Sequence, residues 1–333
     1  MKVLVTGGAG YIGSTVCSAL LDAGHTPVIL DSLITGREEF TRCRTMYKGD
    51  ISDVSLLERI FSEHPQIECA IHLAALIVVP DSVADPYEYY TENVSKSLTF
   101  FKFLLSKGVG KVVFSSSASI YDDAPDFLVT EKSPLNPRSP YAKTKYIIEL
   151  ILEDFCAAYD FKAISLRYFN VIGADPKLRS GLQSASPSHI LGKLVSVAEG
   201  ALDKVTITGV DWPTRDGTGL RDYIHVWDLA RAHVLAVERF DKAVSASGAG
   251  YTPINLGCGA GVTVNEIIRA FEKVYGREIA KATAPPRAGD VAGAYADTAK
   301  ARELLGWKAE LSIEDAVKDA LEWGKARKAA LGY

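Results

Sequence analysis

Short apolar runs recur along the first half of the chain and alternate with stretches typical of helices. The runs lie at residues 3–6, 27–30, 69–75 and 111–114. Runs of this length and composition are typical of strands buried in a parallel sheet, and residues 87–106 are typical of a long helix. Strand and helix signals in alternation predict a doubly wound α/β fold, a Rossmann-type parallel sheet with right-handed crossovers.

The alternation loosens after about residue 171, where turn and loop residues appear. We expect helices at residues 191–198, 226–240, 264–275, 298–305 and 313–325, and strands at 205–208 and 253–256. Ser312, with Asp315 three residues later, resembles a capping box. The pattern predicts a large domain of residues 1–170 plus about 226–257, and a smaller, discontinuous lobe of about 171–225 and 258–333.

Three glycines follow the first strand, at positions 7, 10 and 13. Glycine there allows a tight turn, close approach to a pyrophosphate and close packing of the next helix, whose N-terminal amides would face the phosphates. The second strand ends in Asp31, an acid at the spacing that accepts ribose hydroxyls and repels a 2′-phosphate. This order of elements predicts a site for NAD rather than NADP, a preference that the nearby Arg37 weakens.

Composition favours a globular enzyme of the cytoplasm. The net charge of 37 − 41 = −4 offers no basic surface for nucleic acid, and no apolar run approaches the ~20 residues of a membrane span. The chain starts directly with a strand, so we expect no signal peptide. Its five cysteines are odd in number and lack C-x-x-C spacing, which favours reduced thiols. No His/Cys/Asp cluster has the spacing of a metal site.

A second group of residues suggests chemistry on an alcohol. Ser139 suits a helix N-cap and Pro140 the first helical position, so Tyr141 and Lys145 fall on one helix face. Lys145 is expected to lower the pKa of the tyrosine and to grip the cofactor ribose, which would make Tyr141 a base near neutral pH. Ser117, after a predicted strand, would orient a substrate hydroxyl while hydride passes to nicotinamide.

These motifs resemble the extended short-chain dehydrogenase/reductase family. Further stretches resemble its UDP-galactose (UDP-glucose) 4-epimerases, and they lie at residues 114–121, 167–170, 216–226 and 255–257. The similarity runs from about residue 2 to about 325. It implies reversible epimerisation at C4 of a UDP-hexose by transient hydride transfer to tightly bound NAD, within carbohydrate and galactose metabolism.

The resemblance also implies roles for individual residues. Those implied to line NAD are Gly7, Gly10, Tyr11, Ile12, Gly13, Asp31, Ser32, Asp50, Ile51, Leu73, Ala74, Ala75, Asn93, Tyr141, Lys145 and Phe169. Those implied to contact the nucleotide sugar are Ser117, Tyr141, Asn170, His189, Thr208, Arg221, Arg287, Asp290 and Ala294. The domain of residues 1–170 would therefore bind NAD, and the smaller lobe the nucleotide sugar. A guanidinium fork suits phosphate oxygens, as expected of Arg221 and Arg287.

Four positions depart from the pattern of many 4-epimerases. Ile77 stands where a lysine is usual, and Val171 replaces a proline. Ser188-His189 replaces a pair of asparagines, and Thr208 replaces an aromatic residue expected to pack on uracil. The last departure leaves the identity of the base open. All four leave Ser117, Tyr141 and Lys145 intact.

The sugar and the assembly are open at this level. Ala294 falls where a tyrosine restricts some members of the family to hexoses without a 2-acetamido group. We therefore expect UDP-N-acetylglucosamine to be accepted, unless Tyr295 fills the space. Apolar side chains on the helices around residues 87–106 and 141–155 suggest a homodimer interface, as in the family; they are Phe100, Phe103, Leu104, Ile147, Leu150 and Ile151.

Three other activities are compatible with the motifs. An epimerase of another nucleotide sugar, such as a UDP-uronate or an acetamido sugar, would use the same residues. A nucleotide-sugar 4,6-dehydratase would need an acidic pair after the active serine, where this chain has Ala118 and Ser119. A non-enzymatic NAD-sensing module would tolerate loss of Tyr141 or Lys145, and both are present.

Overall fold

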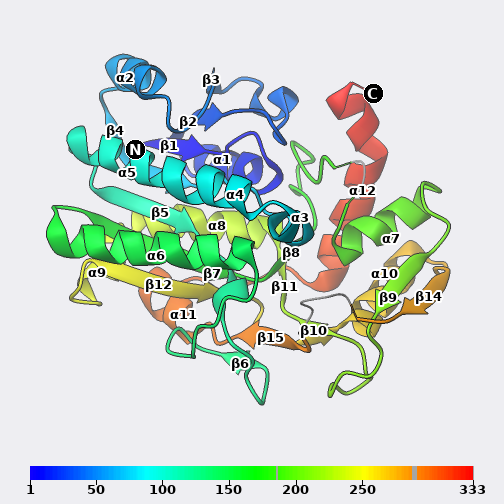
Figure 1. The fold of residues 1–333 in the computed structure, drawn as a ribbon. Helices are drawn as coiled ribbons and strands as arrows, with labels where there is room; N and C mark the ends of the chain where they lie inside the picture. The colour runs from blue at the N-terminus through cyan, green and yellow to red at the C-terminus, as the bar shows by residue number, and fades with distance from the viewer. Residues whose placement is uncertain (185–186, 287–290, 333) are drawn as a thin grey trace.

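The core of the molecule is a seven-stranded parallel sheet, seen in a computed structural model that describes residues 1–184, 187–286 and 291–332. The strand order is β12-β7-β5-β4-β1-β2-β3 (Figure 1). In chain order the strands are β1 (Lys2–Thr6), β2 (Thr26–Asp31), β3 (Thr45–Lys48), β4 (Ile67–His72), β5 (Lys111–Ser115), β7 (Lys162–Tyr168) and β12 (Tyr251–Leu256). The strands are added outward in opposite directions on the two sides of the β1–β4 pair, first β2 and β3 and then β5, β7 and β12. The predicted doubly wound α/β fold is therefore confirmed.

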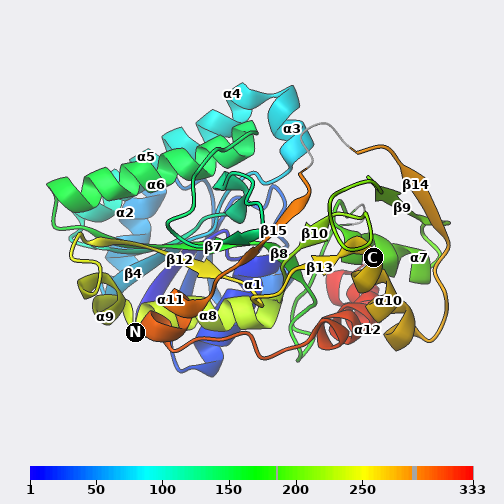
Figure 2. The ribbon, with the colours of Figure 1, turned by 90° about the horizontal axis from the view of Figure 1, so that it is seen from below.

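Helices cover both faces of this sheet (Figure 2). One face packs on α2 (Val54–Glu63), α5 (Lys96–Ser106) and α6 (Pro140–Ala158), and the other on α1 (Tyr11–Asp22), α8 (Val226–Glu238) and α9 (Phe240–Ser245). The strands are buried on both faces and are therefore almost wholly apolar, for example β1, whose residues after Lys2 are all buried. This packing brings the carboxyl ends of the strands to one edge.

The helix expected at residues 87–106 is present, but it is not α-helical throughout. It divides into α4 (Pro86–Tyr89), a π-helical turn (Tyr90–Ser95) and α5. The widened turn carries Asn93, whose side chain is fully buried and bonds to groups outside the helix. Propensity alone does not reveal such an insertion, because it is held by tertiary contacts rather than by the local sequence.

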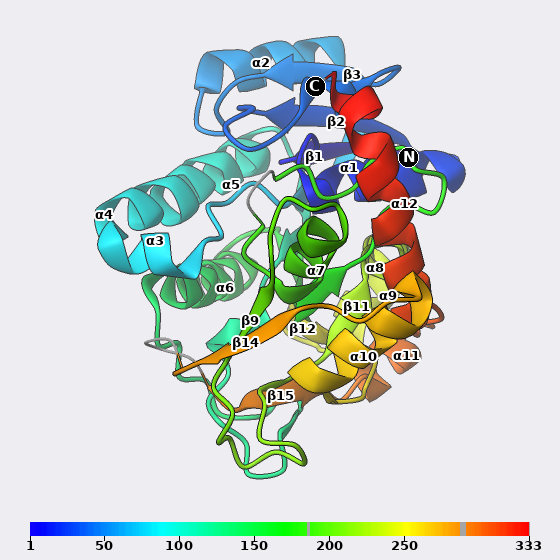
Figure 3. The same cartoon turned by 90° about the vertical axis from the view of Figure 1, so that its right-hand side faces the viewer.

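A second lobe forms beyond the carboxyl edge of the sheet. It contains α7 (Ile190–Ala198), α10 (Val264–Tyr275) and α12 (Ile313–Leu331), which share one apolar core, and the parallel pair β9 (Val205–Thr208) and β14 (Lys281–Ala284). The predicted capping box at Ser312 and Asp315 is confirmed. α12 runs past Lys325, where we expected its end, and packs Trp323 and Leu331 against Phe40 beside the large sheet (Figure 3).

Small sheets join the two parts of the molecule. β8 (Asn170–Ile172) pairs with β11 (Tyr223–His225). A mixed sheet contains β13 (Val262–Thr263), β10 (Leu220–Arg221), β15 (Gly293–Ala296) and β6 (Leu128–Val129). The sequence analysis did not predict these strands, since segments of two to four residues carry too little periodicity to be recognised.

The predicted boundary at residue 257 assigns too much of the C-terminal region to the second lobe. Helix α11 (Ala299–Leu305) packs on β12, α8 and α9. Ala301, Leu305 and the indole of Trp307 are buried in the same core as β1 and α8, and Trp307 Nε1 donates to Asp228 O (2.9 Å). By its packing, α11 therefore belongs with the large sheet.

Candidate functional site

The glycine loop is shaped by close backbone contacts at the end of β1. Gly7 has φ +71°, and a Cβ there would lie 2.8 Å from the backbone nitrogen of Ala74. A Cβ on Gly13 would lie 2.0 Å from Gly7 O, so only glycine lets α1 start against this loop. Gly10 is the N-cap of α1 and no side chain caps it. The N-terminal amides of α1 are thus placed to meet an anion.

Asp31 lies at the end of β2 beside this loop. Its carboxylate accepts from Ala9 N (2.9 Å) and Leu33 N (2.8 Å), which fixes its orientation in a largely buried setting. The next residue, Ser32, is exposed. An oriented carboxylate at this edge can still accept hydroxyl donors, because each oxygen has a second acceptor site.

Asp50 and Ile51 follow β3. Asp50 forms an ion pair with Lys96 (2.6 Å) and accepts from Ser52 N, and these bonds lower its carboxyl pKa against the effect of burial. Both carboxylate oxygens therefore have partners within the chain. Ile51 is buried and contributes to the core under α2.

The end of β4 is joined to the π-turn by a buried polar chain that sequence reasoning missed. His72 bonds through Nδ1 to Thr6 Oγ1 and through Nε2 to Ser97 Oγ, both at 2.8 Å, and Ser97 in turn donates to Asn93 O. Burial lowers the pKa of His72 to about 3, so the ring is neutral. Strand β4 ends at His72, and the small residues Ala74 and Ala75 follow it rather than lie within it.

Asn93 connects this chain to the catalytic helix. Its amide oxygen accepts from Leu76 N (2.8 Å), and its nitrogen donates to Leu76 O (3.0 Å) and Thr144 Oγ1 (3.1 Å). The loop after β4, the π-turn and α6 are thus held together at one point. Asn93 was implied to contact a cofactor, and it is placed beside the loop formed by Leu73, Ala74 and Ala75.

The residues present fit a dinucleotide. The glycine loop after β1 leaves a space that a Cβ would fill, and the N-terminus of α1 that follows has no side-chain cap. The oriented acid Asp31 ends β2, the strand paired with β1. Tyr11 and Ile12 open α1, and Tyr11 OH donates to Gly173 O (2.6 Å) at the start of the second lobe. Phe169, between β7 and β8, is half-buried.

Ser117, Tyr141 and Lys145 come together at the ends of β5 and α6. The predicted helix start is confirmed: Ser139 caps α6 by accepting from Ala142 N (3.1 Å), and Pro140 is its first residue. Ser117 Oγ lies 2.9 Å from Ser119 Oγ, and the Ser117 side chain is beside Tyr141. Lys145 Nζ donates to Ser115 O (2.9 Å) and lies 5.9 Å from the centre of the Tyr141 ring.

The expected low pKa of Tyr141 is wrong for the protein's own groups. Burial raises the pKa of Tyr141 above its ordinary value, and the neighbouring hydroxyl of Ser117 only partly opposes this. Burial also lowers the pKa of Lys145 to about 7, against the opposing charge of Glu149. Sequence spacing indicates that the two side chains are neighbours, but it does not indicate how strongly both are desolvated.

On the second lobe, Asn170, Arg221 and Ala294 lie on joined strands. Asn170 N donates to Asp222 O (3.0 Å), which follows Arg221, and Arg221 pairs with Ala294 between β10 and β15. The Arg221 guanidinium donates to the carbonyls of Leu220 and Ala292. Two of the implied substrate contacts, Arg287 and Asp290, lie outside the described residues.

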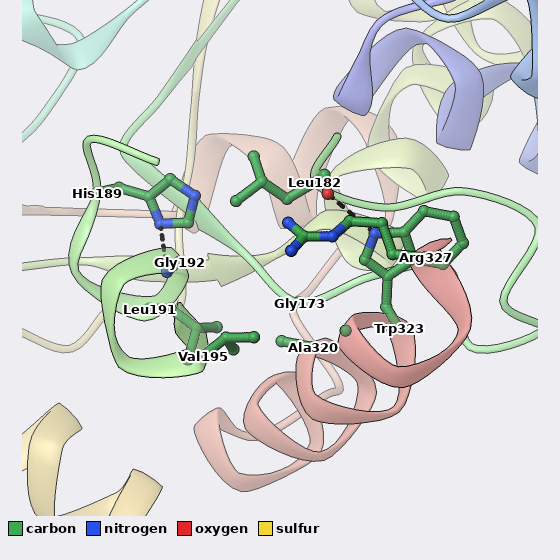
Figure 4. A pocket seen from close by; sticks show the side chains of 10 residues that line it. Gly173, Leu182, His189, Leu191, Gly192, Val195, Ala320, Trp323 and Arg327 are labelled. Atoms are coloured by element: carbon green, nitrogen blue, oxygen red, sulfur yellow. Dashed lines mark hydrogen bonds between the residues drawn. The ribbon is translucent and has the colours of Figure 1, made fainter. Parts of the chain in front are cut away.

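His189 and Thr208 lie in the outer part of this lobe. His189 is the N-cap of α7 and accepts from Gly192 N (3.2 Å) (Figure 4). It lines a cavity of about 20 Å³ with Gly173, Leu182 and Arg327, which is large enough for one water but not for a sugar nucleotide. Thr208 ends β9 and pairs with Ala284.

An aromatic side chain does lie beside Thr208, although not at that position. A Cβ on Gly209 would be 2.3 Å from Trp212 Nε1, so the indole lies directly on Gly209. The sequence analysis missed it, because a tryptophan in a turn-rich loop gives no signal of its orientation.

Within the described ranges, no group of three or more His, Cys, Asp or Glu side chains could hold a metal ion. Over the same residues, no helix has the length and apolar character required to cross a membrane.

The doubly wound sheet, the glycine loop and the Ser–Tyr–Lys group define a dinucleotide-dependent protein with a site for chemistry on an alcohol. The chain belongs to the NAD dependent epimerase/dehydratase family, whose model matches residues 3–257. It is 40% identical over 333 residues to the UDP-glucose 4-epimerase of Bacillus subtilis (strain 168), covering 97% of this chain and 96% of that protein.

Solved structures agree with this placement. The UDP-glucose 4-epimerase of Bifidobacterium longum in complex with NAD+ and UDP superposes with a TM-score of 0.91, at 38% identity and 100% coverage of both chains. The UDP-glucose 4-epimerase of Stenotrophomonas maltophila, with bound NAD and formylated UDP-arabinopyranose, superposes with a TM-score of 0.92 at 37% identity and 99% coverage of both chains.

Proposed function

We propose that the protein is an NAD-dependent UDP-hexose 4-epimerase that interconverts UDP-galactose and UDP-glucose. The observation that carries the proposal is the convergence of Ser117, Tyr141 and Lys145 at the carboxyl edge of the sheet, next to a cradle that fits a dinucleotide. Relatives that cover nearly the whole chain are named for this activity. Its five free cysteines fit a reducing compartment, and we propose a cytoplasmic location.

In this proposal each residue of the chain has a defined task. Tyr141 Oη takes the proton of the sugar 4-hydroxyl and later returns one, and Ser117 Oγ orients that hydroxyl. Lys145, tethered to Ser115 O, supplies positive charge beside the phenol. NAD held by the glycine loop and Asp31 supplies a hydride acceptor that is regenerated in each turnover.

The substrate would be held mainly by its nucleotide. Arg221, together with Arg287 and Asp290, would bind the uridine diphosphate, with Asn170, His189 and Thr208 around it. Inversion at C4 requires the sugar to present both faces to the same catalytic group, so the sugar must be held less tightly than the diphosphate. An assay of turnover on a panel of nucleotide sugars, including UDP-galactose and a UDP-uronate, tests the assignment directly.

The geometry of β15 supports a sugar site with space for a larger substituent beside Ala294. Ala294 and Tyr295 are successive residues of β15, so their side chains point to opposite faces of the strand. Ala294 shares a face with its register partner Arg221 on β10. Tyr295 is on the opposite face, and its register partner is Leu128 on β6, at the other edge of β15. Tyr295 therefore does not fill the space beside Ala294, and we propose that the site accepts a 2-acetamido group.

We also propose a homodimer through α5 and α6, on narrower grounds than the sequence suggested. Three of the apolar residues counted for this surface, Phe100, Phe103 and Leu104, are buried within the monomer's own core. Of the other three, Leu150 is 41% exposed, and Ile147 and Ile151 are half-buried. Leu98 on α5, which the sequence analysis did not count, is 43% exposed. Apolar side chains exposed on adjacent helices favour association.

The first prediction concerns the base. Tyr141→Phe should lower kcat by at least about a hundredfold, because no other group replaces the proton transfer at the 4-hydroxyl. NAD content should be unchanged. Tyr146→Phe, on the same helix, is the control and should keep wild-type turnover. Activity of Tyr141→Phe near that of the wild type would remove Tyr141 from the mechanism.

The second prediction concerns the cofactor. The purified protein should carry NAD(H), and Asp31→Ala should weaken NAD more than NADP, because the carboxylate favours ribose hydroxyls and repels a 2′-phosphate. Dissociation constants for both nucleotides measure this. Asp53→Ala, which removes an exposed helix cap instead, should leave their ratio unchanged. Tighter binding of NADP than NAD by the unmodified protein would show that Asp31 does not select the cofactor.

The third prediction concerns the sugar. Ala294→Tyr should slow turnover of UDP-N-acetylgalactosamine selectively, because a phenol fills the space that the acetamido group needs. Initial rates on this sugar and on UDP-galactose measure the effect. Tyr295→Phe, on the opposite strand face, should change neither rate. Equal slowing of both sugars by Ala294→Tyr, or no wild-type turnover of the acetamido sugar, contradicts this role.

The fourth prediction concerns assembly. The wild type should sediment as a dimer at micromolar concentration, and Leu150→Glu should produce monomer, because a buried unpaired carboxylate disfavours the interface. Leu202→Glu places the same charge at a similarly exposed leucine of the other lobe and should leave the dimer intact. A wild-type protein that sediments only as monomer excludes this interface.

A further inference from the structure

Three consecutive serines at the end of β5 contact three residues of α6 that lie one turn apart. Ser115 O accepts from Lys145 Nζ (2.9 Å), Ser116 Oγ donates to Glu149 Oε1, and Ser117 lies beside Tyr141. Because positions four residues apart on a helix share a face, this spacing aligns all three α6 side chains with the serine turn. Two of these contacts belong to the proposed catalytic group, and the middle one does not.

The middle contact belongs to a buried ion pair. Glu149 is 3% exposed and Arg167, on β7, is 4% exposed. Arg167 Nε donates to both carboxylate oxygens (3.0 and 3.2 Å), and Nη2 donates to Oε2 as well. Arg167 Nη1 also donates to Tyr121 OH (3.0 Å). Paired charges that fill each other's hydrogen-bonding positions hold their elements in one geometry.

We propose that Glu149 is a positioning residue for the reaction: it holds the face of α6 at a fixed distance from the serine turn and supplies the counter-charge of Lys145. Glu149 has no place in the proton transfer itself, and the inference rests on the proposed epimerase function. A structural pair located elsewhere would stabilise the fold equally well. This one joins the catalytic helix to the residue between Ser115 and Ser117.

The charges around the pair set its electrical effect. Three side chains face Glu149: Arg167 from β7, Tyr121 from the segment after β5, and Tyr251 from β12. Glu131 lies near Tyr121. Lys145 faces Ser115 O, the rings of Phe114 and Tyr141, and the neutral His72. Glu149 is the group that raises the pKa of Lys145 against the effect of burial. Its loss should therefore favour neutral Lys145.

The test compares pH profiles of purified holoenzymes with UDP-galactose. In Glu149→Gln, kcat should fall about tenfold or more with KM within about twofold, since small displacements of a catalytic group are costly and the substrate contacts remain. The alkaline limb of kcat should move about one unit to lower pH, because Lys145 loses its proton more easily. Glu149→Asp keeps the charge and should restore the limb.

Two further variants separate positioning from stability. Asp228→Asn removes another buried carboxylate, which accepts from Glu310 N and Leu311 N instead of from the serine turn, and should leave the limb in place. If Glu149→Gln does not fold, Ser116→Ala removes the link to the serine turn without leaving Arg167 unpaired. It should lower kcat at constant KM, and a wild-type kcat there would overturn the inference.

Two other results overturn it as well. One is a Glu149→Gln enzyme with the wild-type kcat and limb, and the other is the same change of limb in Asp228→Asn. No turnover of UDP-galactose by the wild type contradicts the proposed function itself. Normal wild-type turnover with an unaltered Glu149→Gln enzyme contradicts only the positioning role.

Discussion

The site depends on the burial of one cation. Lys145 is 3% exposed, and the fall of its pKa from 10.5 to about 7 corresponds to about 5 kcal/mol against the ammonium form in the folded chain. Because the folded pKa is the lower one, this penalty is complete below about pH 7 and disappears as the pH rises to 10.5. This pKa value already includes the charge of Glu149, which opposes the effect of burial, and Ser115 O and the Phe114 ring also contact the ammonium group. The sheet edge and α6 must therefore stay in register around this one side chain.

Most of the main sheet could be predicted from sequence because its signals are local, although β3 and β7 were not among the predicted strands. Buried parallel strands are continuous apolar runs, and glycine is favoured where a helix ends at positive φ, as at Gly24 (φ +80°) and Gly108 (φ +72°). The π-turn at Tyr90–Ser95 could not be predicted. It is held by Asn93 and Ser97, whose partners Leu76 and His72 lie elsewhere in the sequence. The helix at α11 was predicted, but its place against the large sheet was not, because the buried contacts of Ala301, Leu305 and Trp307 decide that place.

The candidate site was predictable to the same extent and for the same reason. Spacing alone put Tyr141 and Lys145 on one helix face, and the sheet topology brought Ser117 to them. The predicted direction of the Tyr141 pKa shift is wrong, because the shift depends on how much water the folded chain excludes from the phenol. Glu149 was missed, although a carboxylate two turns beyond Tyr141 on the buried face of α6 is unusual enough to have been noticed. Its partner Arg167 lies on a different strand.

In the proposed function, Asp222 would help the chain to hold the nucleotide more firmly than the sugar. Its buried carboxylate accepts from Cys258 N (2.7 Å), Gly259 N (3.2 Å) and Ala296 N (3.0 Å). A Cβ on Gly257 would lie 2.2 Å from that carboxylate, so glycine is required where the chain leaves β12. The carboxylate thus ties the strand of Arg221 both to the large sheet and to β15.

Arg221 is consequently fixed relative to the catalytic edge, because its guanidinium donates to the carbonyls of Leu220 and Ala292. Ala294, its partner on β15, presents only a methyl group on the same face. In the proposed function, a guanidinium held in this way would give the diphosphate one position, whereas a methyl-lined wall would impose little on the sugar ring. That difference is what inversion at a carbon distant from the nucleotide requires, because the same catalytic group must meet both faces of the ring without release of the substrate.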